Sequence, residues 1–200
     1  MNLLNPLQLH QNRQQWLEPL SLSFTEACSL QSFKTPILVN NIHLFSKQYQ
    51  SIKELVNRDE ITWMFSQGSN FGPIRNYSSL WDYAPHDLSM ILDLSNEYPK
   101  IINIKEIKNN KLSLYAIELL FNNFSSLSIV GNAGINKKRL FNVYANLNLL
   151  YNGLNISQNP LANAIKVFID AIYGIYDYRL GLDLSFKIIK ILETCSNQLS

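Results

Sequence analysis

The spacing of hydrophobic and polar positions alternates between helical and extended segments in the first half of the chain. Apolar residues at helical intervals predict three helices, over Thr25–Phe33, Ser46–Val56 and Leu80–Leu94. The second of these would turn Tyr49, Ile52, Leu55 and Val56 to one side. Pro85 fits a first turn, which favours a start of the third helix after Ala84. Short β-branched runs predict strands over Pro36–Val39 and Ile61–Phe65.

The second half of the chain has longer extended runs and then two amphipathic segments. Turns rich in Asn, Gly and Lys separate runs that predict a strand meander, over Ile101–Ile107, Leu112–Phe121, Ser126–Val130 and Leu140–Leu150. Two closing helices are predicted over Pro160–Ile172 and Leu180–Leu192. The first would have Leu161, Ile165, Phe168, Ile169 and Ile172 on its inner face. Glycines and a proline mark residues 67–77 as a surface loop.

Length and composition favour one α/β domain. The 200 residues, 46% of them hydrophobic, are enough to close one sizeable core. Residues 1–15 are polar, rich in Gln and Asn, and interrupted by Pro6, so we interpret them as an extension before a domain at 16–200.

Charge and cysteine content exclude several classes of function. The 17 basic and 15 acidic residues are spread along the chain, without the basic stripe that nucleic-acid binding needs. We interpret the cluster Lys137-Lys138-Arg139 as a solvated turn without function. The start lacks the pattern of a signal peptide, and no stretch approaches the ~18 apolar residues of a membrane span. Two separate cysteines, Cys28 and Cys195, suggest no disulfide framework and fit a reducing cytoplasm.

One short segment combines ionisable groups at a helical spacing. Asp82 and His86 are four residues apart, so on a helix they share a face and the carboxylate can orient an imidazole that moves a proton. The structural alternative is that Asp82 caps the helix and His86 fills a polar corner. His10 and His43 lie far from this segment and have no partner at metal-ligand spacing, so we predict no metal site.

Three further residues near this segment are candidates for substrate binding. Arg75 can anchor an anionic or hydroxylated ligand, or serve the fold alone. The aromatic rings of Tyr77 and Trp81 can line a sugar-binding face, although aromatic residues at such spacing more often belong to a core.

The same segments carry a resemblance to a known family. Gly72-Pro73-Ile74-Arg75 followed by Leu80–Leu94 resembles the central motif of the Gfo/Idh/MocA oxidoreductases. Leu17–Ala27 is similar to the family's Glu-Lys-Pro junction and the helix after it, and the closing helices also resemble the family's. The resemblance spans Trp16 to Leu199.

The resemblance implies a fold, a site and partners. It implies the C-terminal α/β (α+β) domain of the family, an open, largely antiparallel sheet with helices packed on one face, through which the chain would form a homo-oligomer. Asp82 and His86 match the family's catalytic pair, in which the His is the acid or base for the hydroxyl of a sugar-like substrate. The family's cofactor is NAD or NADP, bound by an N-terminal Rossmann domain. No lysine precedes Pro19 where the family has its catalytic lysine.

The sequence does not predict a nucleotide site in these residues. Its seven glycines form no Gly-x-Gly-x-x-Gly, and no strand precedes Trp16 to begin a βαβ unit. We therefore expect a truncated family member that binds no cofactor and is inactive alone. A separate Rossmann-domain chain would make it a subunit of a split dehydrogenase. The missing lysine favours instead a non-catalytic ligand-binding or assembly module, and a gene remnant would show the same pattern.

Overall fold

The computed structural model describes residues 24–29, 39, 41–56, 60–70, 78–110, 112–133, 138–146, 148–152 and 160–200. The helices are α2 (Phe24–Ser29), α3 (Lys47–Leu55), α4 (Ser79–Ser95), α5 (Pro160–Ile172) and α6 (Leu182–Leu199), with short 3-10 helices η2 (Ile42–Phe45) and η4 (Tyr178–Leu180). The strands are β1 (Ile61–Ser69), β2 (Ile101–Asn109), β3 (Leu112–Leu120), β4 (Ser125–Gly131), β5 (Lys138–Ala145) and β6 (Asn148–Asn152). No described helix is long and apolar enough to cross a membrane.

The strands form one open sheet in the order β2-β3-β4-β1-β5-β6. Only β1 and β4 run parallel, and every other pair is antiparallel. The predicted open, largely antiparallel sheet is confirmed. The predicted meander is wrong in one respect, because β1, an earlier strand of the chain, lies between β4 and β5. The run 140–150 is also not one strand, since Asn146 adopts a left-handed φ of 49° in the turn between β5 and β6.

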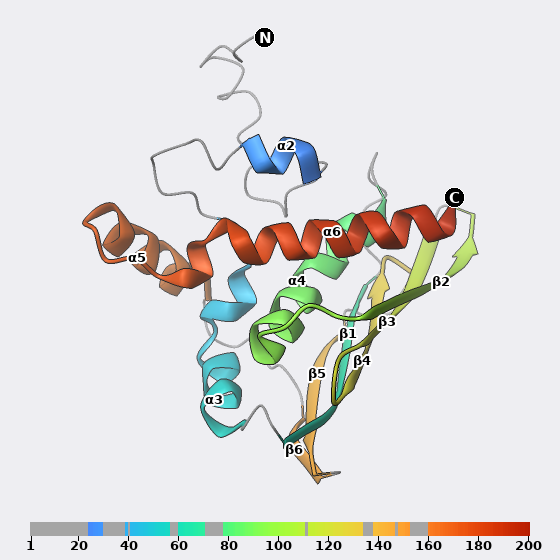
Figure 1. Ribbon diagram of the computed structural model, residues 1–200, viewed down its shortest axis with the longest axis horizontal. Helices are drawn as coiled ribbons and strands as arrows, with labels where there is room; N and C mark the ends of the chain where they lie inside the picture. Colours follow the sequence, from blue (N-terminus) through green and yellow to red (C-terminus); the bar gives the residue numbers. More distant parts are fainter. Residues whose placement is uncertain are drawn as a thin grey trace, which may run out of the picture.

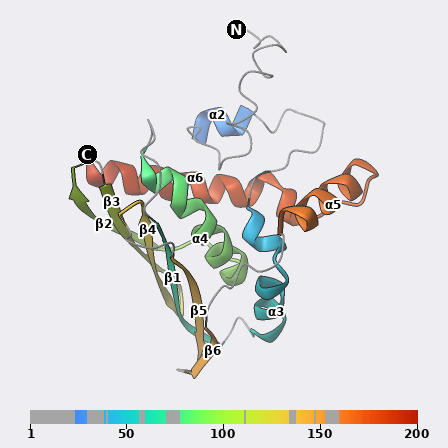
Figure 2. The same ribbon diagram turned by 180° about the vertical axis from the view of Figure 1, so that it is seen from behind.

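The helices cover one face of this sheet (Figures 1 and 2). Figure 1 shows α4 against the sheet and α6 crossing over α4. Burial alternates accordingly: in β4 the side chains of Ser126, Ser128 and Val130 are buried beneath the helices, whereas Leu127 and Ile129 point the other way and are half-buried. The expected packing of helices on one face is therefore confirmed.

Helix α3 follows its sequence pattern except at its end. Ser46 caps it as predicted, accepting a hydrogen bond from the backbone N–H of Tyr49 at 3.1 Å. Tyr49 and Ile52 are buried, but Leu55 is 70% exposed, so its predicted place on the inner side is wrong. Leu55 is the last helical residue, and the neighbouring Val56 fills the inner position instead.

Helix α4 begins earlier than the proline suggests. Its N-cap is Ser78, whose hydroxyl accepts from the N–H of Leu80, so the predicted start after Ala84 is wrong. Pro85 lies inside the helix, where its missing N–H leaves the Trp81 carbonyl without the usual partner. Full burial of Ala84 and Leu88 on either side of it stabilises the helix through packing.

The closing helices lie where they are predicted, with one error of orientation. Helix α5 has the predicted bounds, but Leu161, Ile165, Ile169 and Ile172 are 43–58% exposed rather than turned inward. The helix packs on the core through Ala164, Val167 and Phe168, since the side with the small alanine approaches most closely. Helix α6 starts at Leu182, after η4, and continues to Leu199.

Several predictions concern residues that the structure does not describe. The extension at 1–15, the junction around Pro19 and the strand at 36–39, apart from Val39, lie outside the described residues. Of the predicted loop at 67–77, residues 67–69 belong to β1, and 71–77 lie outside the described residues.

Candidate functional site

Helix α4 carries the two predicted acid/base residues. Asp82 lies in its first turn and His86 one turn later, so the predicted helical spacing of the pair is confirmed. Both side chains are half-buried, at the end of the helix that the Ser78 cap fixes. The predicted ligands Arg75 and Tyr77 lie outside the described residues.

The imidazole of His86 lies in a largely closed environment. Its Nδ1 is buried and makes no hydrogen bond within the described part of the chain. Burial lowers the pKa of His86 well below its usual range, and electrostatic interaction with His43 and with Arg139 lowers this pKa further. His86 is therefore neutral at neutral pH, the form that can accept a proton.

His43 is part of this site, although nothing local in the sequence places it there. Its ring lies edge-on to that of His86, with 5.2 Å between the ring centroids and 81° between the planes. It comes from η2 and is 4% exposed. His43 is far from the motif in sequence but close to it in space, because η2 packs against α4. Within the described residues, no group of three or more His, Cys, Asp or Glu side chains could hold a metal ion.

The residue after His86 anchors the helix to the sheet. The carboxylate of Asp87 is 1% exposed and its Oδ1 lies 2.7 Å from Nη1 of Arg139 on β5. Its Oδ2 accepts a hydrogen bond from Ser128 Oγ at 3.3 Å, and Ser128 accepts one from Ser66 at 2.7 Å. Burial raises the pKa of Asp87, and Arg139 and the two serines oppose that rise.

Arg139 reaches Asp87 because the neighbouring strand has no side chain in the way. It lies opposite Gly68 of β1, where an added Cβ would be 2.2 Å from Arg139 Nη1 and 3.1 Å from Asp87 Oδ1. The interpretation of Lys137-Lys138-Arg139 as a solvated turn is therefore wrong for Arg139, whose side chain is 13% exposed. The only sequence signal was a glycine inside a strand, which often marks a close approach.

The aromatic residues of α4 have contacts within the fold. Trp81 is half-buried between α4 and α6, and its Nε1 donates to Ser196 Oγ at 3.1 Å. Tyr83 is buried and donates to Asn70 Oδ1 at 2.5 Å. These contacts give both side chains a role within the fold, and substrate binding by Trp81 stays a prediction.

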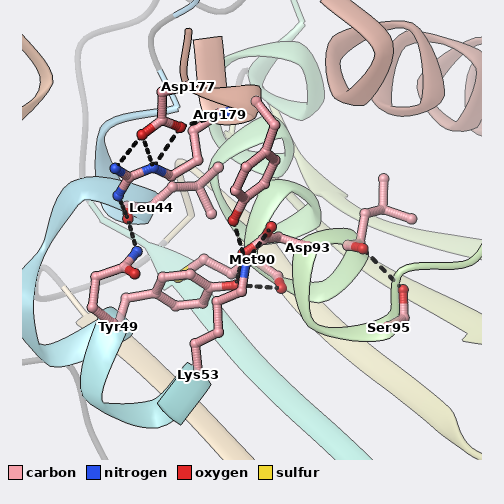
Figure 3. Close-up of polar contacts among 11 residues, drawn as sticks. Leu44, Tyr49, Lys53, Met90, Asp93, Ser95, Asp177 and Arg179 are labelled. Carbon is pink, nitrogen blue, oxygen red and sulfur yellow. Dashed lines mark hydrogen bonds and ion pairs between the residues drawn. The ribbon is translucent and has the colours of Figure 1, made fainter. Parts of the chain in front are cut away.

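A second polar cluster fixes the other end of α4, and no sequence motif predicts it (Figure 3). Asp93 is 2.9 Å from Lys53 Nζ and accepts from the hydroxyl of Tyr49 at 2.5 Å. Beside it, Arg179 binds Asp177 and its guanidinium also donates to the Leu44 carbonyl at 3.4 Å. The cluster ties α3, η2 and η4 to the C-terminal half of α4. It therefore holds η2, which carries His43, close to the helix that carries His86.

No family model matches this sequence, and no curated protein matches it either. Solved structures do match. A dehydrogenase from Chromobacterium violaceum aligns with 97% of this chain and 74% of its own, at 10% identity and a TM-score of 0.76. UDP-N-acetylglucosamine 3-dehydrogenase from Acidithiobacillus ferrooxidans aligns over 88% and 67%, at 12% identity and a TM-score of 0.71. Scyllo-inositol dehydrogenase from Lactobacillus casei, solved with NAD(H) and scyllo-inositol, aligns over 90% and 68%, at 12% identity and a TM-score of 0.70.

At this low sequence identity, the similarity of the chain to these solved structures is a similarity of fold. They cover most of the chain, and they come from dehydrogenases of one structural type. The chain therefore has the fold of Gfo/Idh/MocA-type oxidoreductases, and the resemblance that its sequence indicates is confirmed at the level of the fold.

Proposed function

We propose that these residues form the substrate-binding domain of an NAD(P)-dependent dehydrogenase that acts on a sugar or a related polyol. The observation that carries the proposal is the neutral, enclosed imidazole of His86 on a helix that ion pairs hold at its middle and near its C-terminal end. The fold adds support, because its neighbours include a scyllo-inositol dehydrogenase with bound NAD(H) and polyol.

In this proposal His86 removes the proton of the hydroxyl group that is oxidised. The hydroxyl proton passes to the imidazole, and the hydride from the same carbon would go to a nicotinamide cofactor held outside these residues. The positive charge of Arg139 keeps His86 neutral, the form that can accept a proton, but it also disfavours the protonated imidazole that the transfer produces. Asp82 lies one turn earlier on α4, and its role in orienting the imidazole or stabilising its charged form stays a prediction.

The described residues do not form a binding site for the hydride acceptor, a nicotinamide cofactor. The sequence has no Gly-x-Gly-x-x-Gly, and the described sheet has no βαβ unit with such a loop at its switch point. A nicotinamide cofactor would therefore be held by a domain outside these 200 residues, on this or another polypeptide. The step derived for this chain is proton transfer alone.

The face of the sheet that no described helix covers supports a proposal of self-association. It carries half-buried aromatic side chains, with the ring of Trp63 5.9 Å from that of Phe65 and 5.2 Å from that of Tyr144. Apolar side chains on a face without helices favour contact with another protein surface. We propose that a second copy covers it, which also suits the alternative of a non-catalytic assembly module.

Calorimetric titration of the purified chain tests the proposed function. We expect scyllo-inositol or UDP-N-acetylglucosamine to give saturable heat that His86→Ala reduces, and NAD and NADP to give none. The matched control is Leu55→Ala, at an exposed position on α3. Binding of NAD would show that the domain assignment is wrong, and the absence of heat with every sugar and polyol would contradict the substrate class.

A further inference from the structure

Two histidines from separate elements meet beside the candidate site, and the proposed function uses only one of them. His43 of η2 places its ring edge-on to that of His86 on α4, with 5.2 Å between the ring centroids and 81° between the ring planes. His43 is 4% exposed, and Nδ1 of His86 is buried. The contact therefore lies inside the protein, where neither ring turns without displacing its neighbours.

This contact can replace the interaction that usually orients an acid/base histidine. In such residues one ring nitrogen commonly donates a hydrogen bond to a carbonyl or carboxylate, and that bond sets the tautomer and the ring plane. Nδ1 of His86 makes no such bond within the described residues. The carboxylate of Asp87, next in the chain, binds Arg139 at 2.7 Å instead. Among the described side chains, His43 is the ring that packs against His86 and limits its rotation.

His43 is suited to this role because other elements hold the backbone that follows it. Side chains of α3, η4 and α5 donate hydrogen bonds to the next two carbonyls: Gln50 and Arg179 to Leu44, at 2.5 and 3.4 Å, and Asn163 to Phe45, at 3.0 Å. Figure 3 shows the approach of Arg179 to the Leu44 carbonyl. The position of His43 is thus fixed independently of α4, as a support for His86 requires.

Charge also couples the two rings. A proton on either imidazole disfavours a proton on the other, because two positive charges at this separation repel each other in a buried environment. The charged groups that also face or flank His86 in the described structure are Arg139 of β5, with the Asp87 carboxylate that it binds, and Asp82, one turn earlier on α4. Among these neighbours, His43 is the one whose residue type ordinarily changes charge near neutral pH, so titration can measure its coupling to His86.

We propose that His43 is a positioning residue that fixes the imidazole plane of His86 through the edge-to-face contact of the two rings. A fixed plane keeps Nδ1 buried and leaves Nε2 as the nitrogen that can take a proton from a substrate hydroxyl. This benefit for proton transfer rests on the proposed function of His86, but the contact itself does not. His43 acts through His86 and needs no contact with the substrate.

Two-bond ¹H–¹⁵N NMR of the imidazoles tests the positioning in the whole chain. Wild-type His86 should show the shifts of one neutral tautomer, because a ring held in one plane keeps its two nitrogens in different environments. His43→Ala should average these shifts toward a mixture of tautomers, and His43→Phe, which restores a ring, should return them to one. Leu55→Ala, at an exposed position on α3, is the control and should match the wild type. A single tautomer in folded His43→Ala would overturn the proposal.

Titration of His86 in His43→Phe tests the contact in a second way. Phenylalanine keeps a ring and removes its charge, so the pKa of His86 should rise but stay below the ~6.5 of a free histidine, because burial persists. An unchanged pKa of His86 would overturn the proposal. Addition of scyllo-inositol or UDP-N-acetylglucosamine separates this result from the proposed function. If wild-type His86 responds to no sugar or polyol, the proposed function fails, and the tautomer and the pKa of His86 still decide the role of His43.

Discussion

Arg139 of β5 crosses Gly68 of the neighbouring strand and places its Nη1 2.7 Å from Oδ1 of Asp87, the residue after His86. Because Asp87 directly follows His86 in the chain, this contact connects the candidate acid/base residue to the middle of the sheet. It makes the position of His86 depend on a buried ion pair and on the absence of a side chain at residue 68.

Removal of one partner of this pair should be costly. Asp87→Asn leaves the guanidinium of Arg139, 13% exposed, without its countercharge, and we expect the free energy of unfolding to fall by about 3 kcal/mol. Urea unfolding followed by circular dichroism measures the change. Asp183→Asn, at an exposed residue of α6, serves as the control. A loss below about 1 kcal/mol, the usual value of an exposed ion pair, would contradict the buried character of this one.

Gly68→Ala should destabilise the protein through Arg139. The new Cβ would lie 2.2 Å from Arg139 Nη1, so the guanidinium must leave Asp87, at a cost of roughly 1–3 kcal/mol. In an Arg139→Met background the obstructing Nη1 is absent, and the same alanine should cost less. A double-mutant cycle measures this coupling. Additive effects of the two changes would mean that Gly68 does not serve the crossing of Arg139.

The stability should depend on pH through His86. Burial lowers the folded-state pKa below the ~6.5 of an unfolded histidine, so between these two values the unfolded chain binds more protons than the folded chain. The free energy of unfolding therefore rises with pH across that window and declines as pH falls below about 6.5. Urea unfolding over this range should show a shallower decline for His86→Gln. Equal slopes for the variant and the wild type would contradict burial of the imidazole.

The cluster at the far end of α4 should contribute to stability and not to proton transfer. Tyr49→Phe removes the hydrogen bond to Asp93 with little change of shape, and we expect a loss of about 1 kcal/mol. Thermal unfolding detects this loss as a lower midpoint. The pKa of His86, measured by NMR, should stay the same, since the cluster holds the opposite end of the helix. A shift of that pKa would show that the two ends are coupled.

Much of the fold could be predicted from local patterns. The bounds of α5, the cap of α3 and most strands follow from hydrophobic spacing and capping residues, which act over a few neighbouring positions. The insertion of β1 between β4 and β5 could not, because it depends on pairing between segments far apart in the chain. The outward side of α5 was also missed, since an apolar stripe predicts burial without saying whether this chain or another protein supplies it.

The candidate site was predictable only in part. Asp82 and His86 share one helix, so their spacing was enough to place them. The contact of His43 with His86, and that of Arg139 with Asp87, join residues 43 and 52 positions apart. In the sequence Arg139 looks like part of a charged turn, and only its position opposite Gly68 makes it a buried partner.

NMR of the histidine side chains tests the central claim most directly. The chain has three histidines, His10, His43 and His86, so substitution of each assigns the imidazole signals. We expect the His86 signal to titrate with a pKa below the ~6.5 of a free histidine and to shift in a saturable way on addition of scyllo-inositol or UDP-N-acetylglucosamine. A pKa at or above that value, together with no response of His86 to any sugar or polyol, would contradict a substrate-binding domain in which His86 accepts the proton.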